Sequence, residues 1–320
     1  EVFYMPTMND KNCVKTSCII GTAVGLLLAT AWIAGCDSDT GQTTERSIDS
    51  ATLTTKVLRF SAIPDQNTTE LKEKFSALAN HLSEHLGVQV AYVSATDYKA
   101  SVEMFKNGDI HLAWFGGLTG VQARQAVPGA RAIAQGEEDP HYVSYFIAHK
   151  DTGLARSDDF PIEMGKFTFT FGSPSSTSGR LMPEFFIRQH FGQSPSAFFQ
   201  NAPGFSGNHD KTVELVESGQ VQVGAVSYKV YEKRVASRKT DPQICKIIWK
   251  TPEYADYNFT AHPDLEKMFG AGFIDKVQAT LIAIDDPQLL QAFPRRSLIK
   301  ASNEDFEGIA QIARDLEFLR

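Results

Sequence analysis

Three consecutive hydroxyl residues, Ser176, Thr177 and Ser178, stand where a strand pattern gives way to a helix pattern. Residues 167–171 alternate phenylalanine with threonine, as β-strands do, and residues 181–190 carry apolar side chains at helical spacing. A helix start leaves backbone N–H groups unpaired and carries the positive end of the helix dipole, so anions bind there. The turn therefore predicts a site for a compact tetrahedral oxyanion. Serine and threonine are also ordinary helix caps that need no ligand, and this alternative stays open.

Three further side chains are candidates for the same site. His209 opens another helix pattern, and a neutral imidazole can donate its N–H to an oxyanion. Trp114 ends a strand pattern just before two glycines, at the sheet edge where ligands of α/β proteins usually bind. Tyr142 begins the strand pattern over residues 142–149, and we expect its ring to line the wall of the pocket. The alternatives are a solvated histidine and aromatic rings that only pack in the core.

Two carboxylates and one more tyrosine complete the predicted set. Asp65 follows the first strand pattern, and Asp256 and Tyr257 follow the second passage between the two halves of the chain. An ionised aspartate facing an anion suits a ligand that keeps a proton, because the carboxylate can accept a hydrogen bond from P–OH. The alternatives are acids in solvated loops, since aspartate is common in turns, and a tyrosine that packs in a hinge.

Strand and helix patterns alternate from Val57 and start again at Lys166, which predicts an α/β fold with a largely parallel sheet. After Trp249 the pattern is mostly helical as far as Arg320. We expect two α/β lobes, the second inserted into the first, joined by a hinge of two crossings. The expected limits are residues 56–149 plus 251–320 for lobe 1 and residues 150–250 for lobe 2.

The first residues predict the location of the protein. Lys11 and Lys15 precede an apolar run over residues 18–34, and the run ends in Ile33-Ala34-Gly35-Cys36. This resembles a bacterial lipobox, so we expect a signal peptide over residues 1–35 and a lipidated Cys36. The alternative is a membrane anchor, for which the run is a little short. Residues 36–55 are poor in apolar side chains and predict a flexible tether, which would hold the domain at the extracytoplasmic or periplasmic face of a membrane.

Composition argues against a nucleic-acid partner, a disulfide and a metal site. The net charge of −7 argues against nucleic acid, and an anionic ligand must then be captured by local donors. Of the four cysteines, only Cys245 would remain free after signal cleavage and lipidation, so we expect no disulfide. No cysteine and histidine cluster has the spacing of a metal site, and we expect neither a metal nor a cofactor.

The chain resembles the phosphonate, phosphite and phosphate-type substrate-binding proteins of ABC importers. The order and spacing of these matching segments carry the resemblance: Leu58–Pro64, Asn107–Gly117, Ser175–Gly179, Gly207–Asp210 and Val221–Ser227. It implies a two-lobed periplasmic-binding-protein fold of type II character, an ABC permease in the inner membrane as partner, and no enzymatic activity. It also implies an oxyanion held by the Ser-Thr-Ser turn, by a histidine on the next loop and by aromatic rings of the other lobe. We expect a monomer.

One position in the sequence narrows the choice of ligand. Relatives that resemble aminoethylphosphonate binders carry an acid where this chain has Tyr228, so the resemblance favours phosphite or methylphosphonate. Phosphate or another oxyanion stays open. An enzyme on the same fold, similar to the pyrimidine synthases of thiamine precursors, would need a catalytic histidine or cysteine in the cleft, and Cys245 lies in an apolar strand pattern. A sensor ectodomain would need a transmembrane helix and a cytoplasmic output.

Overall fold

The structure is a computed structural model that describes residues 56–319. The predicted signal peptide, Cys36 and the predicted tether lie outside these residues. A first sheet has the strand order β11-β4-β10-β3-β1-β2. Its strands are β1 (Val57–Ala62), β2 (Gln89–Tyr92), β3 (Leu112–Phe115), β4 (Arg131–Gly136), β10 (Asn258–Ala261) and β11 (Leu298–Lys300).

This first sheet is mixed, so the prediction of a largely parallel sheet is wrong. Strand β1 pairs in parallel with β2 and β3, whereas β10 runs antiparallel to β3 and β4, and β11 antiparallel to β4. The prediction of a mostly helical chain after Trp249 is also wrong at β10 and β11. Strand β10 has four residues, all buried, and so short a buried run carries no alternation that would mark a strand.

A second sheet has the order β7-β6-β8-β5-β9. Its strands are β5 (Ser144–His149), β6 (Phe169–Phe171), β7 (Gly204–Phe205), β8 (Val223–Ser227) and β9 (Cys245–Lys250). The sequence pattern places residues 144–149 in lobe 1, but β5 pairs antiparallel with β8 and β9 and so belongs to the second sheet. A strand's own periodicity does not say which sheet it joins, because its partners are distant in sequence.

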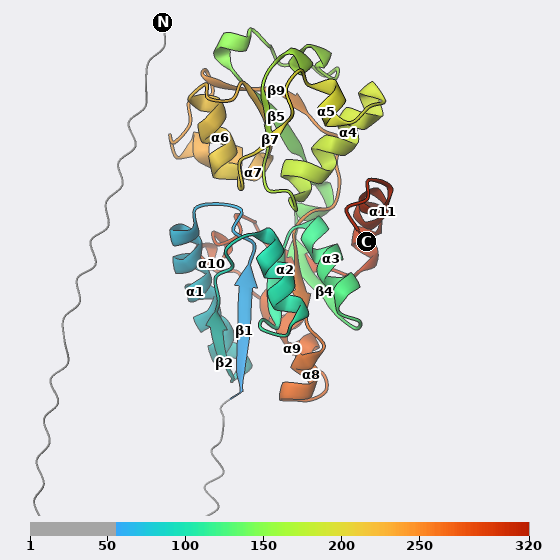
Figure 1. The fold of residues 1–320 in the computed structure, drawn as a ribbon. Coiled ribbons are helices and arrows are strands. Elements are labelled where there is room, and N and C mark those ends of the chain that lie inside the picture. The colour runs from blue at the N-terminus through green and yellow to red at the C-terminus, as the bar shows by residue number, and fades with distance from the viewer. Residues whose placement is uncertain (1–55, 320) are drawn as a thin grey trace, which may run out of the picture. The chain divides into compact units, whose positions relative to one another are not determined.

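Helices flank both sheets (Figure 1). With the first sheet are α1 (Thr68–Leu86), α2 (Tyr98–Lys106), α3 (Gly117–Ala126), α8 (Asp264–Phe269), α9 (Phe273–Ile282), α10 (Pro287–Leu290) and α11 (Glu307–Asp315). With the second are α4 (Met182–Phe191), α5 (Pro195–Phe198), α6 (His209–Glu217) and α7 (Tyr228–Ala236). Their starts follow local chemistry: the Asn67 side chain caps α1 and that of Asp97 caps α2.

Two crossings join the sheets within one compact unit. The first runs between β4 and β5 and contains a short 3₁₀ turn, η1 (Asp139–His141); the second runs between β9 and β10. Tyr142 and Tyr254 exchange backbone hydrogen bonds of 2.9 and 3.0 Å, which tie the crossings side by side. A pair of adjacent short crossings is the arrangement from which hinge motions arise.

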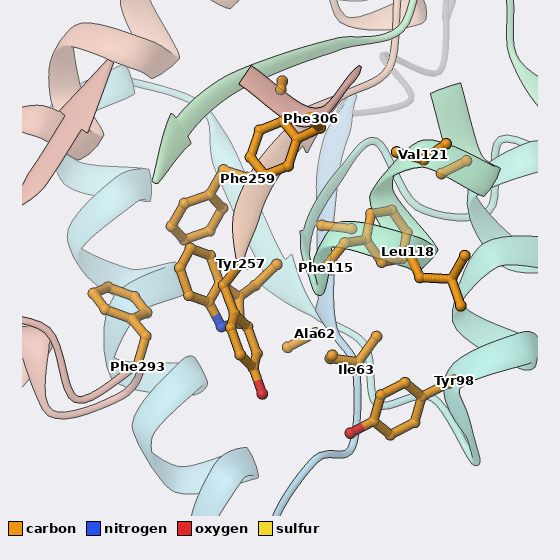
Figure 2. Packing of buried hydrophobic residues seen from close by; sticks show 14 of the residues in the cluster. Ala62, Ile63, Tyr98, Phe115, Leu118, Val121, Tyr257, Phe259, Phe293 and Phe306 are labelled. Atoms are coloured by element: carbon orange, nitrogen blue, oxygen red, sulfur yellow. The ribbon is translucent and has the colours of Figure 1, made fainter. Parts of the chain in front are cut away.

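The core of the first sheet is rich in aromatic rings (Figure 2). Trp114 and Phe259 pack with ring centroids 4.8 Å apart, and Phe293 contacts both rings. Such pairs add about 0.5–1.5 kcal/mol beyond the area that they bury. Cys245 belongs to a smaller cluster behind the second sheet, where burial raises the pKa of its thiol to about 12. That environment does not suit a nucleophile.

Residues 56–319 contain neither a candidate membrane-spanning helix nor a cluster of metal-binding side chains. No helix there combines the length and apolar character needed to cross a bilayer. No group of three or more histidine, cysteine or acidic side chains in this range is placed to hold a metal ion.

Candidate functional site

The Ser-Thr-Ser segment forms the turn that leads into α4. Ser176 precedes a wide helical turn, Thr177–Leu181, and its side-chain oxygen accepts the N–H of Gly179 at 2.9 Å. Gly179 leaves little room for a side chain, because a Cβ there would lie 3.0 Å from Oγ of Ser176 and 3.1 Å from the His209 ring. Thr177 and Ser178 are buried. The turn therefore presents its hydroxyl groups to the interior, as an anion site requires.

His209 faces this turn from the start of α6. Its Nδ1 accepts the N–H of Ser227 at 3.3 Å, and its Nε2 lies 3.4 Å from Oγ of Ser178. Burial lowers the pKa of the imidazole to about 4, so the ring is neutral near pH 7. Because Nδ1 accepts a hydrogen bond, the ring proton resides on Nε2. The imidazole thus points an N–H donor at the Ser178 hydroxyl, in position for an oxyanion.

Asp256 meets the turn from the other side. Its Oδ1 accepts the N–H of Gly117 at 2.8 Å, while its Oδ2 is buried and has no hydrogen-bond partner among residues 56–319. Burial raises the pKa of this carboxyl to about 7, and hydrogen bonds from Gly117 and Thr177 act in the opposite direction. An unpartnered buried carboxylate oxygen is costly. A protonated ligand oxygen would satisfy it.

Three packed aromatic rings, those of Trp114, Tyr142 and Tyr257, line one side of the cluster and form what we call the aromatic wall. Trp114 stacks on Tyr257 with ring centroids 5.5 Å apart, and Tyr142 packs on Tyr257 at 5.4 Å. The Tyr257 hydroxyl donates to Oδ2 of Asp65 at 2.8 Å, and the Tyr142 hydroxyl is bonded to that of Ser227. The Tyr257 hydroxyl hydrogen is thus used, and the Tyr142 hydroxyl is paired with Ser227 as donor or as acceptor, so these tyrosines offer mainly ring surface to the space between them.

The Asp65 side chain holds Tyr257 in place. Burial raises the pKa of its carboxyl to about 6, opposed by the hydrogen bond from Tyr257. The Asp65 backbone carbonyl accepts the N–H of His209 at 3.1 Å, so the residue also contacts the second half of the site. These contacts make Asp65 a positioning residue within the predicted set.

Sequence reasoning missed Tyr98. Its hydroxyl is buried and has no hydrogen-bond partner among residues 56–319, and it points inward past Ile63 (Figure 2). Burial raises the pKa of this hydroxyl well above its ordinary value, the charges of Asp65 and Asp256 raise it further, and the nearby Ser176 hydroxyl lowers it. Tyr98 is therefore a further candidate donor. Its one signal in the sequence is its position directly after the helix cap Asp97, at a sheet edge.

All nine predicted residues lie in one linked cluster. Contacts join Ser178 to His209, His209 to Asp65, and Asp65 to Tyr257 and its ring neighbours. Thr177 and Asp256 are joined through the first turn of α3. The Ser176 oxygen is already used as a cap, although its O–H remains a donor. The arrangement can surround an anion with donors while offering it one acceptor.

The sequence of this chain matches a known protein family. A sequence model of the family described as "ABC transporter, phosphonate, periplasmic substrate-binding protein" matches residues 60–306. The chain belongs to this family. The matched range contains all nine predicted site residues. Family membership makes the protein a substrate-binding component of an ABC transporter.

Two relatives align with this chain in sequence over most of their length. The chain is 38% identical over 272 residues to a probable ABC transporter phosphite binding protein, PhnD1, of Prochlorococcus marinus, covering 83% of this chain and 91% of the relative. It is 29% identical over 273 residues to the phosphate-import protein PhnD of Mycolicibacterium smegmatis, covering 81% and 78%.

A solved structure confirms the fold. PhnD1 of Prochlorococcus marinus in complex with methylphosphonate matches with a TM-score of 0.77 and 37% identity, over 82% of this chain and 98% of that one. This phosphonate-family chain therefore has the predicted two-lobed fold of periplasmic binding proteins, with one α/β sheet in each lobe.

Proposed function

We propose that this protein is a high-affinity binding lipoprotein that captures phosphite or a small alkylphosphonate, such as methylphosphonate, for an ABC importer. One observation carries the proposal: the unpartnered Oδ2 of Asp256 lies beside the donor-rich turn at Thr177. Such a site suits an anion that keeps a proton near neutral pH. Phosphorus oxyanions do so, whereas sulfate does not and would be repelled by the ionised form of Asp256, which predominates above about pH 7.

The aromatic wall supports a small fourth substituent on phosphorus. Once three oxygens are held by the turn, His209 and Asp256, the remaining substituent meets the faces of Trp114 and Tyr257. A hydrogen atom or a methyl group packs well there, while a fourth charged oxygen would be desolvated without a partner. The methylphosphonate complex of the relative PhnD1 supports the same choice.

Phosphate is the second candidate, since one relative is named a phosphate-import protein. The fourth oxygen of phosphate would need a hydrogen-bond donor at the aromatic wall. The hydroxyl groups of Tyr142 and Tyr257 already bond to Ser227 and Asp65, so a rearrangement would be required. We therefore rank phosphate below phosphite and methylphosphonate. An enzyme on this fold is ranked lower still, because Cys245 is buried behind the second sheet.

The proposed location follows from the first residues. Residues 1–35 act as a signal peptide, Cys36 carries the lipid, and residues 36–55 tether the binding domain to the membrane surface. The domain works as a monomer in the periplasm or at the extracytoplasmic face, where it delivers its ligand to the permease.

The test is a thermal-shift series followed by calorimetry with phosphite, methylphosphonate, phosphate, aminoethylphosphonate and sulfate. A ligand that binds only the native state raises the melting temperature in proportion to its affinity. We expect the largest shift with phosphite or methylphosphonate and none with sulfate. A sulfate shift equal to theirs, or no shift with either phosphorus ligand, would overturn the proposal.

A further inference from the structure

A buried ion pair lies behind the aromatic wall, and neither of its residues is among the nine predicted site residues. Arg295 precedes β11, and Asp139 opens the turn η1 in the first crossing. The exposed fractions of their side chains are 3% and 0%. Arginine and aspartate are seldom buried so completely without a function or a full set of partners.

The partners of Arg295 fix its position. Nε of Arg295 lies 3.0 Å from both carboxylate oxygens of Asp139, and Nη2 donates to Oδ1 at 2.6 Å. Nη1 donates to the backbone oxygen of Phe293 at 2.6 Å, and the N–H of Gly136 donates to Oδ2 of Asp139 at 2.7 Å. A side chain at Gly136 is excluded, because a Cβ would lie 2.4 Å from Cγ of Arg295. The guanidinium is therefore held rigidly.

The guanidinium lies against three rings of the wall. Its central carbon is 4.9 Å from the ring centroid of Tyr257, 5.3 Å from that of Tyr142 and 5.7 Å from that of Trp114. A cation at such distances is attracted by the electron-rich ring faces. These rings therefore already have a fixed cation beside them.

The positive end of the pair faces the wall. Burial chiefly raises the pKa of the Tyr142 hydroxyl; the charge of Arg295 lowers it and outweighs the opposite effect of Asp139. Lys229, which pairs with Glu138 at 2.9 Å, adds a second cation to the lining of the same space. Among the described side chains of that lining, the single carboxylate is Asp65, which already accepts from Tyr257.

Little room remains between these groups. The space bounded by Asp65, Trp114, Tyr142, Tyr257 and Arg295 measures about 10 Å³, at the lower limit for a cavity that can hold one water. A hydrogen atom or a methyl group on phosphorus fits beside such a space. A longer tail must push into it and then faces the cationic side of the wall.

We propose that Arg295, held by Asp139, is a specificity-determining residue that makes the aromatic wall reject ligands with an ammonium-bearing tail. The inference rests on the proposed function and extends it from the anion to its substituent. An ammonium at the wall would stand across the rings from a like charge, and the one carboxylate in the lining of that space, Asp65, already accepts a hydrogen bond from Tyr257. Such repulsive elements are a common source of specificity.

The wild-type protein tests the inference directly. Propylphosphonate and aminoethylphosphonate have tails of equal length, one ending in CH₃ and the other in NH₃⁺. We expect calorimetry to show propylphosphonate binding at least about tenfold more tightly, because like charges in a desolvated site repel strongly. If both are excluded equally, size alone decides and the inference is overturned. It is also overturned if aminoethylphosphonate binds as tightly as propylphosphonate.

Variants test whether the Arg295–Asp139 pair causes this preference for propylphosphonate. Arg295→Gln combined with Asp139→Asn removes both charges without leaving one unpaired, and we expect the propyl-to-aminoethyl ratio to narrow by about tenfold. Arg295→Lys keeps the charge and should keep the ratio. If the pair were merely structural, its loss would weaken the binding of both ligands alike. An unchanged affinity ratio in a folded double variant would therefore overturn this inference and leave the proposed function standing. Wild-type protein that binds neither phosphite nor methylphosphonate would instead overturn the proposed function, and this inference with it.

Discussion

The backbone N–H of Leu118 donates a hydrogen bond of 3.0 Å to Oγ1 of Thr177. Leu118 lies in the first turn of α3, beside the first sheet, and Thr177 lies in the turn that follows the second sheet's strand β6. Since Oγ1 accepts from Leu118, the hydroxyl hydrogen of Thr177 remains free to donate. One side chain therefore joins the two lobes, and its single hydroxyl hydrogen, which faces Asp256 in this structure, is the donor that we propose for the ligand.

The first prediction concerns Thr177→Val, which keeps the β-branched shape and deletes the hydroxyl. A hydrogen bond to a charged group is worth about 1.5–3 kcal/mol, so affinity should fall by about 10- to 150-fold. Calorimetry with phosphite and methylphosphonate measures the change. Thr280→Val, on α9 away from the site, is the matched control and should bind as wild type. Equal affinity for Thr177→Val would remove this hydroxyl from the site.

The second prediction concerns affinity against pH. Burial raises the pKa of the Asp256 carboxyl to about 7, so the carboxyl and the ligand share one proton in the bound state. Above neutral pH both lose it, and we expect affinity to fall because two negative charges then face each other. In Asp256→Asn the amide can donate to a fully deprotonated ligand, so the profile should flatten. Superimposable profiles for the two proteins would exclude this role for Asp256.

The third prediction concerns the stability of the unliganded protein. Burial raises the pKa of Asp256 to about 7 and that of Asp65 to about 6, from an ordinary value of 3.8. The native state then binds more protons than the unfolded state between about pH 4 and 7, so stability is highest below this window and falls as pH rises through it. Asp256 alone accounts for up to about 4 kcal/mol.

Urea unfolding at several pH values measures this slope. We expect Asp256→Asn to remove much of the loss between pH 4 and 7. Asp275→Asn, at an exposed position on α9, is the control and should retain the slope of the wild type. A wild-type protein that gains stability from pH 4 to 7, in step with the Asp256→Asn variant, would contradict the prediction.

The fourth prediction concerns closure. Contacts across the lobes include the hydrogen bond from His209 to the Asp65 carbonyl and the 2.7 Å ion pair between Lys239 and Glu70. A ligand that touches both lobes favours the state in which these contacts form. Small-angle scattering should therefore show a smaller radius of gyration with saturating ligand than without it. An unchanged radius, with binding verified by calorimetry, would argue against a hinged clamp.

The fifth prediction concerns the anchor. We expect a diacylated Cys36 at the start of the mature chain, because one acyl chain gives only marginal membrane binding. Mass spectrometry of detergent-extracted protein should find a lipidated N-terminal peptide. Cys36→Ser should release the protein from the membrane fraction. Unmodified Cys36 with residues 1–35 still attached would contradict the prediction.

Much of the site was predictable because its chemistry is local. The hydroxyl run at 176–178 and the histidine at a helix start mark donors by residue type and by position relative to a strand and a helix. The motifs also carried the family resemblance, which the match to residues 60–306 confirms. The strands that were missed, β7, β10 and β11, are short, so they lack the periodicity that such a prediction needs.

The sequence by itself determined the α/β class, the family and a candidate set of oxyanion-binding residues, because periodicity and residue type are properties of neighbouring positions. Only the tertiary structure decided which sheet β5 joins, that Tyr98 carries a buried unpartnered hydroxyl, and that Arg295 lies behind the aromatic wall with Asp139. Asp139 and Arg295 are 156 residues apart, and their contact depends on how the chain crosses between the sheets. Burial then sets the pKa of Asp256, because desolvation depends on the surrounding fold and not on the residue type.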